Sequence, residues 1–203
     1  MFVKRLIFPL VALFGFLSTE VHSQTEPEKD SPSKIIAKGA RSQIGVTLRY
    51  DPVYVDLKYP GGDLPKEFGV CTDVVVRAFR EAKVDLQQLV HEDMAKNFGV
   101  YPKKWGLKRT DRSIDHRRVL NLMKFFERQG KSAKMSEDAA DFSPGDVVAW
   151  TLDNGLDHMG IVGDGRSEDG KRPLIIHNIG QGAQEEDVLF KFKMIGHYRY
   201  FRD

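Results

Sequence analysis

Apolar residues recur at helical spacing in the segment that follows Gly69, which reads GVCTDVVVRAFR. Counted from Cys71, they fall at i, i+3, i+4, i+7, i+8 and i+11, which is one continuous face of an α-helix. Gly69 permits a sharp entry of the chain, and Asp73 in the first turn suits the positive end of a helix dipole. The pattern predicts a helix that begins near Cys71 and packs one face on the core.

The second half of the chain has a different pattern, with short apolar runs separated by clusters of Gly, Asp and Pro. Such runs are typical of antiparallel strands, and here they occupy residues 143–152, 157–165, 172–182 and 187–201. Two further helical patterns lie between the first helix and these runs, in residues 85–135. Helices followed by a β-meander predict an α+β domain.

The first residues have the charge order of an exported protein. Lys4 and Arg5 precede an apolar run at residues 6–17, and a short polar stretch follows, as in a secretory signal peptide. Twelve residues are too few to span a bilayer as a helix, which takes about 20, although an uncleaved anchor stays open as an alternative. Val21 and Ser23 are small enough for the −3 and −1 positions, so we predict a signal peptide at 1–23 and a periplasmic or secreted protein.

The mature chain is then expected to begin at Gln24, with no membrane segment left. Residues 24–33 are polar and contain proline, which predicts a flexible leader, and residues 34–203 have the length of a single domain. Removing the signal peptide leaves 29 basic and 28 acidic residues. Because a balanced surface does not attract nucleic acid or anionic lipid, we expect neither as a partner, and we expect a monomer.

Cys71 is the single cysteine of the chain, so no internal disulfide can form. An odd cysteine in an exported protein indicates intermolecular pairing or a free thiol, although free cysteine is also a common buried apolar residue. At a helix start, unpaired backbone N–H groups favour the thiolate and lower its pKa, and they could also stabilise an oxyanion. The helix by itself leaves a reactive and a structural role open.

A thiol nucleophile needs a base, and His158 and His177 both lie in strand patterns. Because alternate residues of a strand face opposite sides, His177 and Asn178 cannot both face His158. The spacing does not decide between these two neighbours. Cys71, His158 and His177 could also ligate a catalytic zinc ion, although the sequence has no close ligand pair such as HxH, HxxxH or CxxC.

The ordered motifs GVCTDVVV, PGDVVAW, HMGIV and IIHNIG resemble the NlpC-type cell-wall peptidases, which are small papain-like cysteine hydrolases of bacteria. From about residue 40 onward, the chain is similar to one bacterial domain family of unassigned function within or beside that superfamily. The resemblance implies a papain-like fold, with N-terminal helices packed on an antiparallel β-meander and the nucleophile at a helix N-terminus. Val70 and Thr72 depart from the Asp and Ser that usually flank the cysteine, and the segment at 85–135 is unusually long.

The same resemblance implies that Cys71 is the nucleophile, that His158 is the general base and that His177 orients this base. Asp73 and Asn178 are further expected to contact the substrate, and neither a metal nor a cofactor is expected. The chain is therefore predicted to be an exported cysteine peptidase or amidase that cleaves amide bonds of peptidoglycan peptides through a thioester. Two alternatives remain: a non-catalytic wall- or peptide-binding module, and an acyltransferase that uses the same thioester.

Two charged stretches allow more than one interpretation. YPKKWGLKR (101–109) interleaves cations with Trp105, as in a solvated loop or in a site that stacks on glycans or bases. IDHRRV places Arg117 and Arg118 in one turn with Asp115 and His116. This turn is expected to be a charged outer face, and the alternative is an arginine that binds a substrate carboxylate.

Overall fold

We describe the fold from a computed structural model, which describes residues 1–2 and 30–202. The predicted cleavage site and most of the predicted signal peptide and leader lie outside the described residues. Within the described part of the chain, no helix combines the length and the apolar character needed to cross a membrane.

The described domain begins with a helix that the sequence pattern did not predict. Helix α1 (Pro32–Arg41) starts inside the range 24–33 that was expected to be a flexible leader. Ser31 caps the helix by accepting a hydrogen bond from the Lys34 N–H at 3.5 Å, and Pro32 fits the first turn because its missing N–H is not needed there. Residues that look polar and irregular in sequence therefore form a helix start.

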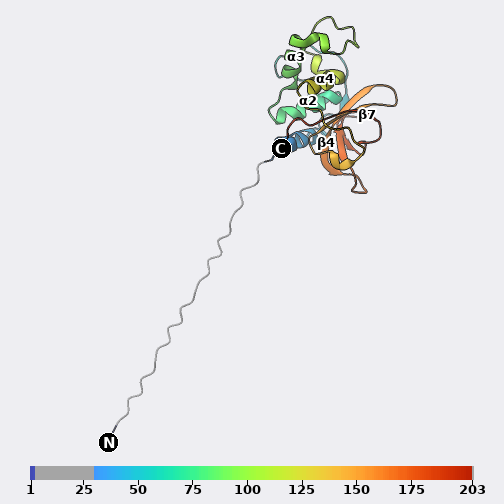
Figure 1. Cartoon of the computed structure of the whole chain (residues 1–203). Helices are drawn as coiled ribbons and strands as arrows, with labels where there is room; N and C mark the ends of the chain where they lie inside the picture. Colours follow the sequence, from blue (N-terminus) through green and yellow to red (C-terminus); the bar gives the residue numbers. More distant parts are fainter. Residues whose placement is uncertain (3–29, 203) are drawn as a thin grey trace.

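The domain consists of helices packed against one side of a twisted sheet (Figure 1). Besides α1, the helices are α2 (Cys71–Glu81), α3 (Leu86–Asn97) and α4 (Val119–Arg128), with 3-10 turns η1 (Phe98–Val100), η2 (Asp115–Arg117) and η3 (Ala139–Asp141). A short parallel pair is formed by β1 (Arg49–Tyr50) and β2 (Phe68–Gly69). The main strands are β3 (Val147–Thr151), β4 (Asp157–Arg166), β5 (Pro173–His177), β6 (Gln184–Glu186) and β7 (Lys193–Tyr198).

The main sheet is antiparallel throughout, with the strand order β6-β5-β4-β3-β7. Strands β3 to β6 follow one another as a meander, and β7 returns to pair with β3 on its other side. The α+β class, the meander and the two extra helices are confirmed. Strand β6 was not predicted, because it consists of three polar residues and gives no apolar alternation.

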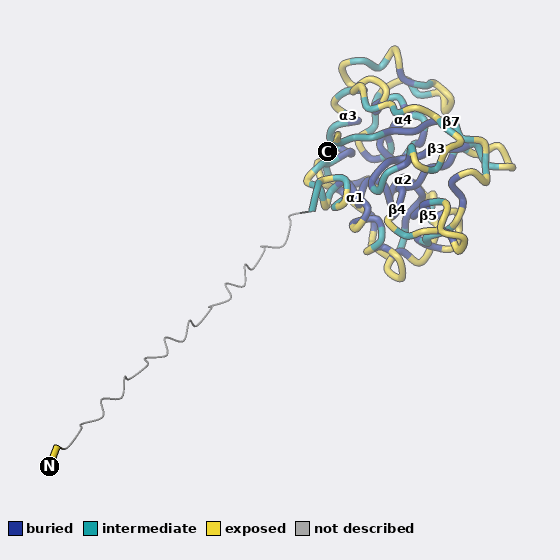
Figure 2. The backbone as a smooth tube through the Cα atoms, turned by 60° about the horizontal axis from the view of Figure 1, so that its bottom comes forward, coloured by how far each residue is buried: buried dark blue, intermediate teal, exposed yellow. Residues whose placement is uncertain are grey.

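Helix α2 is the centre of the core (Figure 2). The predicted face is buried, with Val74, Val75, Ala78 and Phe79 all at 0% exposure. The opposite face is buried as well, including Thr72 and Val76, because α2 also contacts α1, α3 and η2 in addition to β4. The long segment at 85–135 therefore encloses the helix that carries the cysteine.

The two faces of the sheet bury different side chains, as the alternation of a strand requires. On β3, Val147 and Ala149 belong to the main core beneath the helices, whereas Val148 and Trp150 belong to a second apolar cluster. The Trp150 indole N–H donates to the Leu189 carbonyl at 3.0 Å, which closes this second cluster. Both faces of the sheet are therefore covered, and the strand ends are fixed in position.

Candidate active site

Cys71 is the first residue of α2, and its side chain is buried, with 4% of the residue exposed. The helix start is stabilised by Asp73, whose carboxylate accepts the backbone N–H of Val70 at 2.7 Å. Gly69 has no positive φ that would require glycine. Close neighbours explain why position 69 has no side chain: a Cβ there would lie 3.1 Å from the Asp73 Cβ and 3.3 Å from Arg77 Nη1. Close packing, rather than a special backbone angle, accounts for this glycine.

The electrostatic state of the thiol differs from the one that its helical position predicts. Burial raises the pKa of Cys71 to about 12, and the charge of Asp73 contributes in the same direction. Hydrogen bonds from the backbone N–H groups of Met159, Thr72 and Cys71 act in the opposite direction but do not offset the burial. The expectation of a lowered pKa is therefore wrong for this structure, because desolvation of the thiolate outweighs the helix N-terminus.

The structure brings the two candidate histidines together at the ends of β4 and β5. His158 Nε2 and His177 Nδ1 are 2.8 Å apart, and the two rings meet edge to face with centroids 5.0 Å apart. Burial lowers the pKa of His158 to about 3 and also lowers the pKa of His177, so both rings are neutral at neutral pH. The Cys71 sulfur accepts a hydrogen bond from the backbone N–H of Met159, the residue after His158 on β4. No hydrogen bond joins the sulfur to the His158 ring among the described residues.

A carboxylate extends this pair on its far side. His177 Nε2 lies 2.9 Å from a carboxylate oxygen of Glu186 on β6, although the two groups do not have the alignment of a regular hydrogen bond. A proton on His177 Nε2 faces this carboxylate, so His177 Nδ1 is the acceptor for His158 Nε2–H. This arrangement leaves His158 Nδ1 as the basic nitrogen. Sequence reasoning missed Glu186, because nothing in the polar run QEE indicates a strand.

The position of the His158 ring depends on two neighbouring residues, Trp150 and Gly160. The ring stacks on Trp150, the residue directly opposite on β3, with centroids 6.1 Å apart. Gly160 allows β5 to come close, since a Cβ at this position would lie 2.7 Å from Ile175 Cγ2 and 3.0 Å from His177 Cβ. A larger residue at position 160 would push His177 away from His158.

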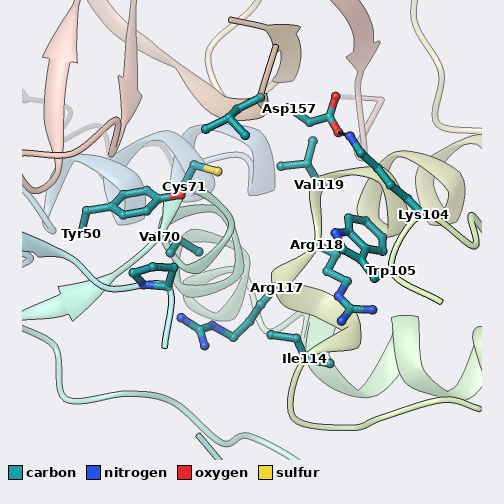
Figure 3. Close-up of a pocket in the computed structure, with 12 residues that line it drawn as sticks. Tyr50, Val70, Cys71, Lys104, Trp105, Ile114, Arg117, Arg118, Val119 and Asp157 are labelled. Atoms are coloured by element: carbon teal, nitrogen blue, oxygen red, sulfur yellow. Dashed lines mark hydrogen bonds and ion pairs between the residues drawn. The ribbon is translucent and has the colours of Figure 1, made fainter. Parts of the chain in front are cut away.

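Cys71 opens into a pocket of about 250 Å³ that is bounded by the 101–109 loop and by η2 (Figure 3). A second pocket of about 340 Å³ is lined by His158. The two pockets share Tyr50, Leu156 and Asp157 as lining residues, so they adjoin at the start of β4. A substrate that spans both pockets would contact the thiol and the histidine together.

Tyr50 is a site residue that the sequence did not reveal. Its hydroxyl lies beside Cys71 in Figure 3, and β1 holds it there by pairing Tyr50 with Gly69. Burial and the nearby Cys71 and Asp73 raise the pKa of Tyr50 to about 12, so the hydroxyl stays protonated and can donate a hydrogen bond. A two-residue strand leaves no periodic signal, and only the parallel pairing of β1 with β2 brings Tyr50 to the cysteine.

Asp73 does not face the pocket. Its carboxylate binds the buried Arg117 guanidinium at 3.0 to 3.3 Å, and Arg117 also donates to the carbonyls of Asp51 and Val53. The expectation that the turn at 115–118 is a charged outer face is wrong for Arg117, whose side chain is 1% exposed. We assign Asp73 a structural role: together with Arg117 it ties the start of α2 to the segment that carries Tyr50.

Asn178 faces away from His158, as the two-residue period of β5 requires. Its side-chain amide donates to the Gly69 carbonyl at 3.0 Å, and its oxygen accepts the Gly180 N–H at 3.1 Å. Asn178 is fully buried, so we assign it a structural role rather than substrate contact. It fixes the residue that precedes Val70 and α2.

The remaining charged stretch forms one wall of the Cys71 pocket. Lys104 and Trp105 are exposed residues of the 101–109 loop, yet both line the pocket. Lys104 binds Asp157 at 2.7 Å, and the Arg118 guanidinium lies 4.5 Å from the centre of the Trp105 ring. Among the described residues, no group of three or more His, Cys, Asp or Glu side chains is arranged to hold a metal ion.

The reactivity of the thiol against pH tests its buried, protonated state. Because the pKa of Cys71 is raised to about 12, iodoacetamide should alkylate the folded protein slowly at pH 7, and the rate should rise about tenfold per pH unit up to that pKa. In urea the thiol should instead follow an ordinary profile with a pKa of about 8.5. Mass spectrometry of timed samples measures both rates. Fast labelling of the folded protein below pH 7 would contradict this prediction and would show a stabilised thiolate.

The arrangement of the helices and the sheet defines an NlpC-like α+β protein, and known structures agree. The chain is similar to NlpC1 from Trichomonas vaginalis, with a TM-score of 0.50 and 14% identity over 90% of this chain and 49% of that one. It thus spans about half the length of that protein. A crystal structure of an N-acetylmuramoyl-L-alanine amidase from Bacteroides uniformis matches with a TM-score of 0.51 and 13% identity, over 84% of this chain and 99% of that one. The predicted NlpC-like fold is confirmed.

The chain belongs to the family described as "Domain of unknown function (DUF1287)", whose model matches residues 37–200. It is 64% identical over 166 residues to "Uncharacterized protein YijF" of Escherichia coli strain K12, which covers 82% of this chain and 80% of that protein. The resemblance to a bacterial domain family of unassigned function is therefore confirmed.

Proposed function

We propose that this protein is an exported cysteine hydrolase that cleaves amide bonds in peptidoglycan peptides. One observation carries the proposal: in an NlpC-like fold, the lone thiol at the start of α2 contacts β4 next to His158, which is bonded to His177. Buried histidine pairs with a carboxylate behind them are well suited to hold one ring nitrogen as a base. Packing of the apolar core does not by itself require His158, His177 and Glu186 to lie together at the strand ends.

The chemistry begins from neutral groups. As the Cys71 sulfur attacks the amide carbonyl carbon, its proton passes to His158, and a bound substrate brings the two into contact and excludes water. The oxyanion receives hydrogen bonds from backbone N–H groups at the start of α2 and from the protonated Tyr50 hydroxyl. The imidazolium then protonates the leaving amine, which departs and leaves a thioester on Cys71. Water gives a proton to His158 and attacks the thioester, the acid departs, and His158 returns the proton to the Cys71 sulfur.

The substrate class follows from the predicted export and from the fold. An amide hydrolase outside the inner membrane of a bacterium meets peptidoglycan peptides as an abundant substrate. One solved structure of similar fold is named as an N-acetylmuramoyl-L-alanine amidase, although identity of 13% carries the fold and not the substrate. The predicted signal peptide lies outside the described residues, so export is part of this proposal.

Digestion of purified peptidoglycan tests the proposal directly. We expect the mature protein, recovered from the extracytoplasmic fraction with its N-terminus at or near Gln24, to release peptide fragments that mass spectrometry identifies. Cys71→Ala should release none, because the nucleophile is missing. Exposed Arg109→Gln is the matched control and should digest normally. Recovery of the intact chain from the cytosol would contradict export, and equal release by Cys71→Ala would contradict thiol catalysis.

A second candidate function has support from the buried thiol. A protonated Cys71 without a hydrogen bond to His158 is compatible with a module that binds wall peptides and does not cleave them. In that case both wild type and Cys71→Ala should bind peptidoglycan in a pull-down assay, and neither should release fragments. Transfer of the acyl group to an added amine, in place of hydrolysis, would instead show an acyltransferase.

A further inference from the structure

Arg118 is a half-buried arginine that lines the Cys71 pocket, and no described residue accepts a hydrogen bond from it. Its Nη1 is shielded from solvent and makes no hydrogen bond to any described residue. Burial lowers the pKa of Arg118, although Asp115 and Asp111 act in the opposite direction from a distance. The guanidinium therefore carries a partly desolvated charge that no carboxylate of the described residues pairs with.

Of the other arginines among the described residues, five are exposed and bind no carboxylate (Arg49, Arg109, Arg112, Arg166 and Arg202), and seven are paired. Each of the following binds a carboxylate directly: Arg41, Arg77, Arg80, Arg117, Arg128, Arg172 and Arg199. The contrast is sharpest with the adjacent Arg117, which Asp73 neutralises. Leaving a partly buried charge unpaired is costly, so an unpaired arginine in the same pocket as a candidate nucleophile points to a ligand that pairs with it.

The surroundings of Arg118 define which chemical group would fit. The Trp105 ring lies over the guanidinium, and Ile114 and Val119 form apolar walls of the same pocket. An aromatic ring occupies the face of a guanidinium and leaves its edge free for hydrogen bonds in the plane. The other two cations that line this pocket are already paired, Lys104 with Asp157 and Arg117 with Asp73. The free edge of Arg118 matches the two oxygens of a carboxylate.

We propose that Arg118 binds a free carboxylate of the substrate peptide, close to the amide that Cys71 attacks. This inference rests on the proposed function, since it takes the Cys71 pocket as the place where a peptide binds. It narrows the preferred substrate to peptides with a free carboxyl group near the scissile bond, over peptides in which that carboxyl is a carboxamide. Trp105 holds the guanidinium by its face, and the apolar walls strengthen the pairing by keeping water out.

Binding can be measured without turnover in a Cys71→Ala background. The probes are two synthetic peptidoglycan stem peptides that differ only in the glutamyl α-carboxyl group, which is free in one and a carboxamide in the other. Trp105 reports binding by fluorescence, because it lines the pocket, whereas Trp150, the other tryptophan, is fully buried against His158 and does not line this pocket. We expect the free carboxylate to bind about 10- to 100-fold more tightly, as a hydrogen-bonded charge pair provides.

Variants assign that preference to one side chain. In the same background, Arg118→Gln should bind both peptides equally, and Arg118→Lys should keep part of the preference because it keeps the charge. Arg109→Gln removes an exposed arginine outside the pocket and should change nothing. Thermal melts confirm that each variant is folded. A preference that survives in Arg118→Gln, or no binding of either peptide, would overturn the inference.

The experiments distinguish failure of the Arg118 inference from failure of the proposed hydrolase function. Preference for the carboxylate that depends on Arg118, without cleavage by the Cys71 protein, would support the subsite and refute the hydrolase. Cleavage of both peptides at equal rates would support the hydrolase and overturn the subsite.

Discussion

Replacing His158 with alanine should reduce turnover of peptidoglycan peptides by about 100- to 10,000-fold, the usual contribution of a general base. His158 precedes Met159, whose backbone N–H contacts the Cys71 sulfur, and its Nδ1 is the nitrogen left free by the contact with His177 at 2.8 Å. Because the pKa of the thiol is raised to about 12, attack at neutral pH depends on a base that takes its proton. Initial rates of fragment release, measured by mass spectrometry, give the loss.

Two companion variants separate the base from the residue that orients it. His177→Ala should lose less activity than His158→Ala, and His177→Asn should lose less again, because an amide oxygen still accepts the His158 N–H. His91→Gln is the control, since it removes a histidine outside both pockets. Unchanged turnover in His158→Ala would remove this residue from the mechanism. A chelator that inactivates the wild type would instead favour the zinc alternative.

Replacing Arg117 with methionine should destabilise the fold by about 3–5 kcal/mol, because it leaves the Asp73 carboxylate buried and unpaired. The same change frees the carbonyls of Asp51 and Val53, so the segment that carries Tyr50 loses its attachment to α2. Urea denaturation measures the free energy of unfolding.

The double variant Arg117→Met with Asp73→Leu should recover part of this loss, because an apolar pair of similar size often replaces a buried ion pair at little cost. Recovery should be incomplete, since the Val70 N–H also loses its acceptor. Lys124→Met is the matched control: it breaks the Lys124–Glu127 pair on the surface and should change stability by less than about 1 kcal/mol. If Arg117→Met and Lys124→Met lowered the free energy of unfolding equally, burial of the Asp73–Arg117 pair would contribute nothing to the stability of the fold.

Local patterns in the chain determined much of the secondary structure and the position of the thiol. Helix α2 begins at Cys71 as the spacing of apolar residues predicts, and β3, β5 and β7 lie within the predicted ranges, while β4 extends one residue beyond its range. These features depend on side chains three or four positions apart in a helix, or two apart in a strand, so they can be read from neighbours. The same periodicity shows that only one of His177 and Asn178 can face His158.

Tertiary structure alone decided the chemistry of the site. The sheet selects His177 as the neighbour of His158 and places Glu186 behind it, while the parallel pairing of β1 with β2 brings Tyr50 to Cys71. Burial reverses the expected direction of the thiol pKa. Each of these results comes from contacts between residues far apart in the chain, and the free energy of a charge depends on how much water those contacts remove. Of two adjacent arginines with identical chemistry, one is therefore neutralised inside the core and the other is left open to the pocket.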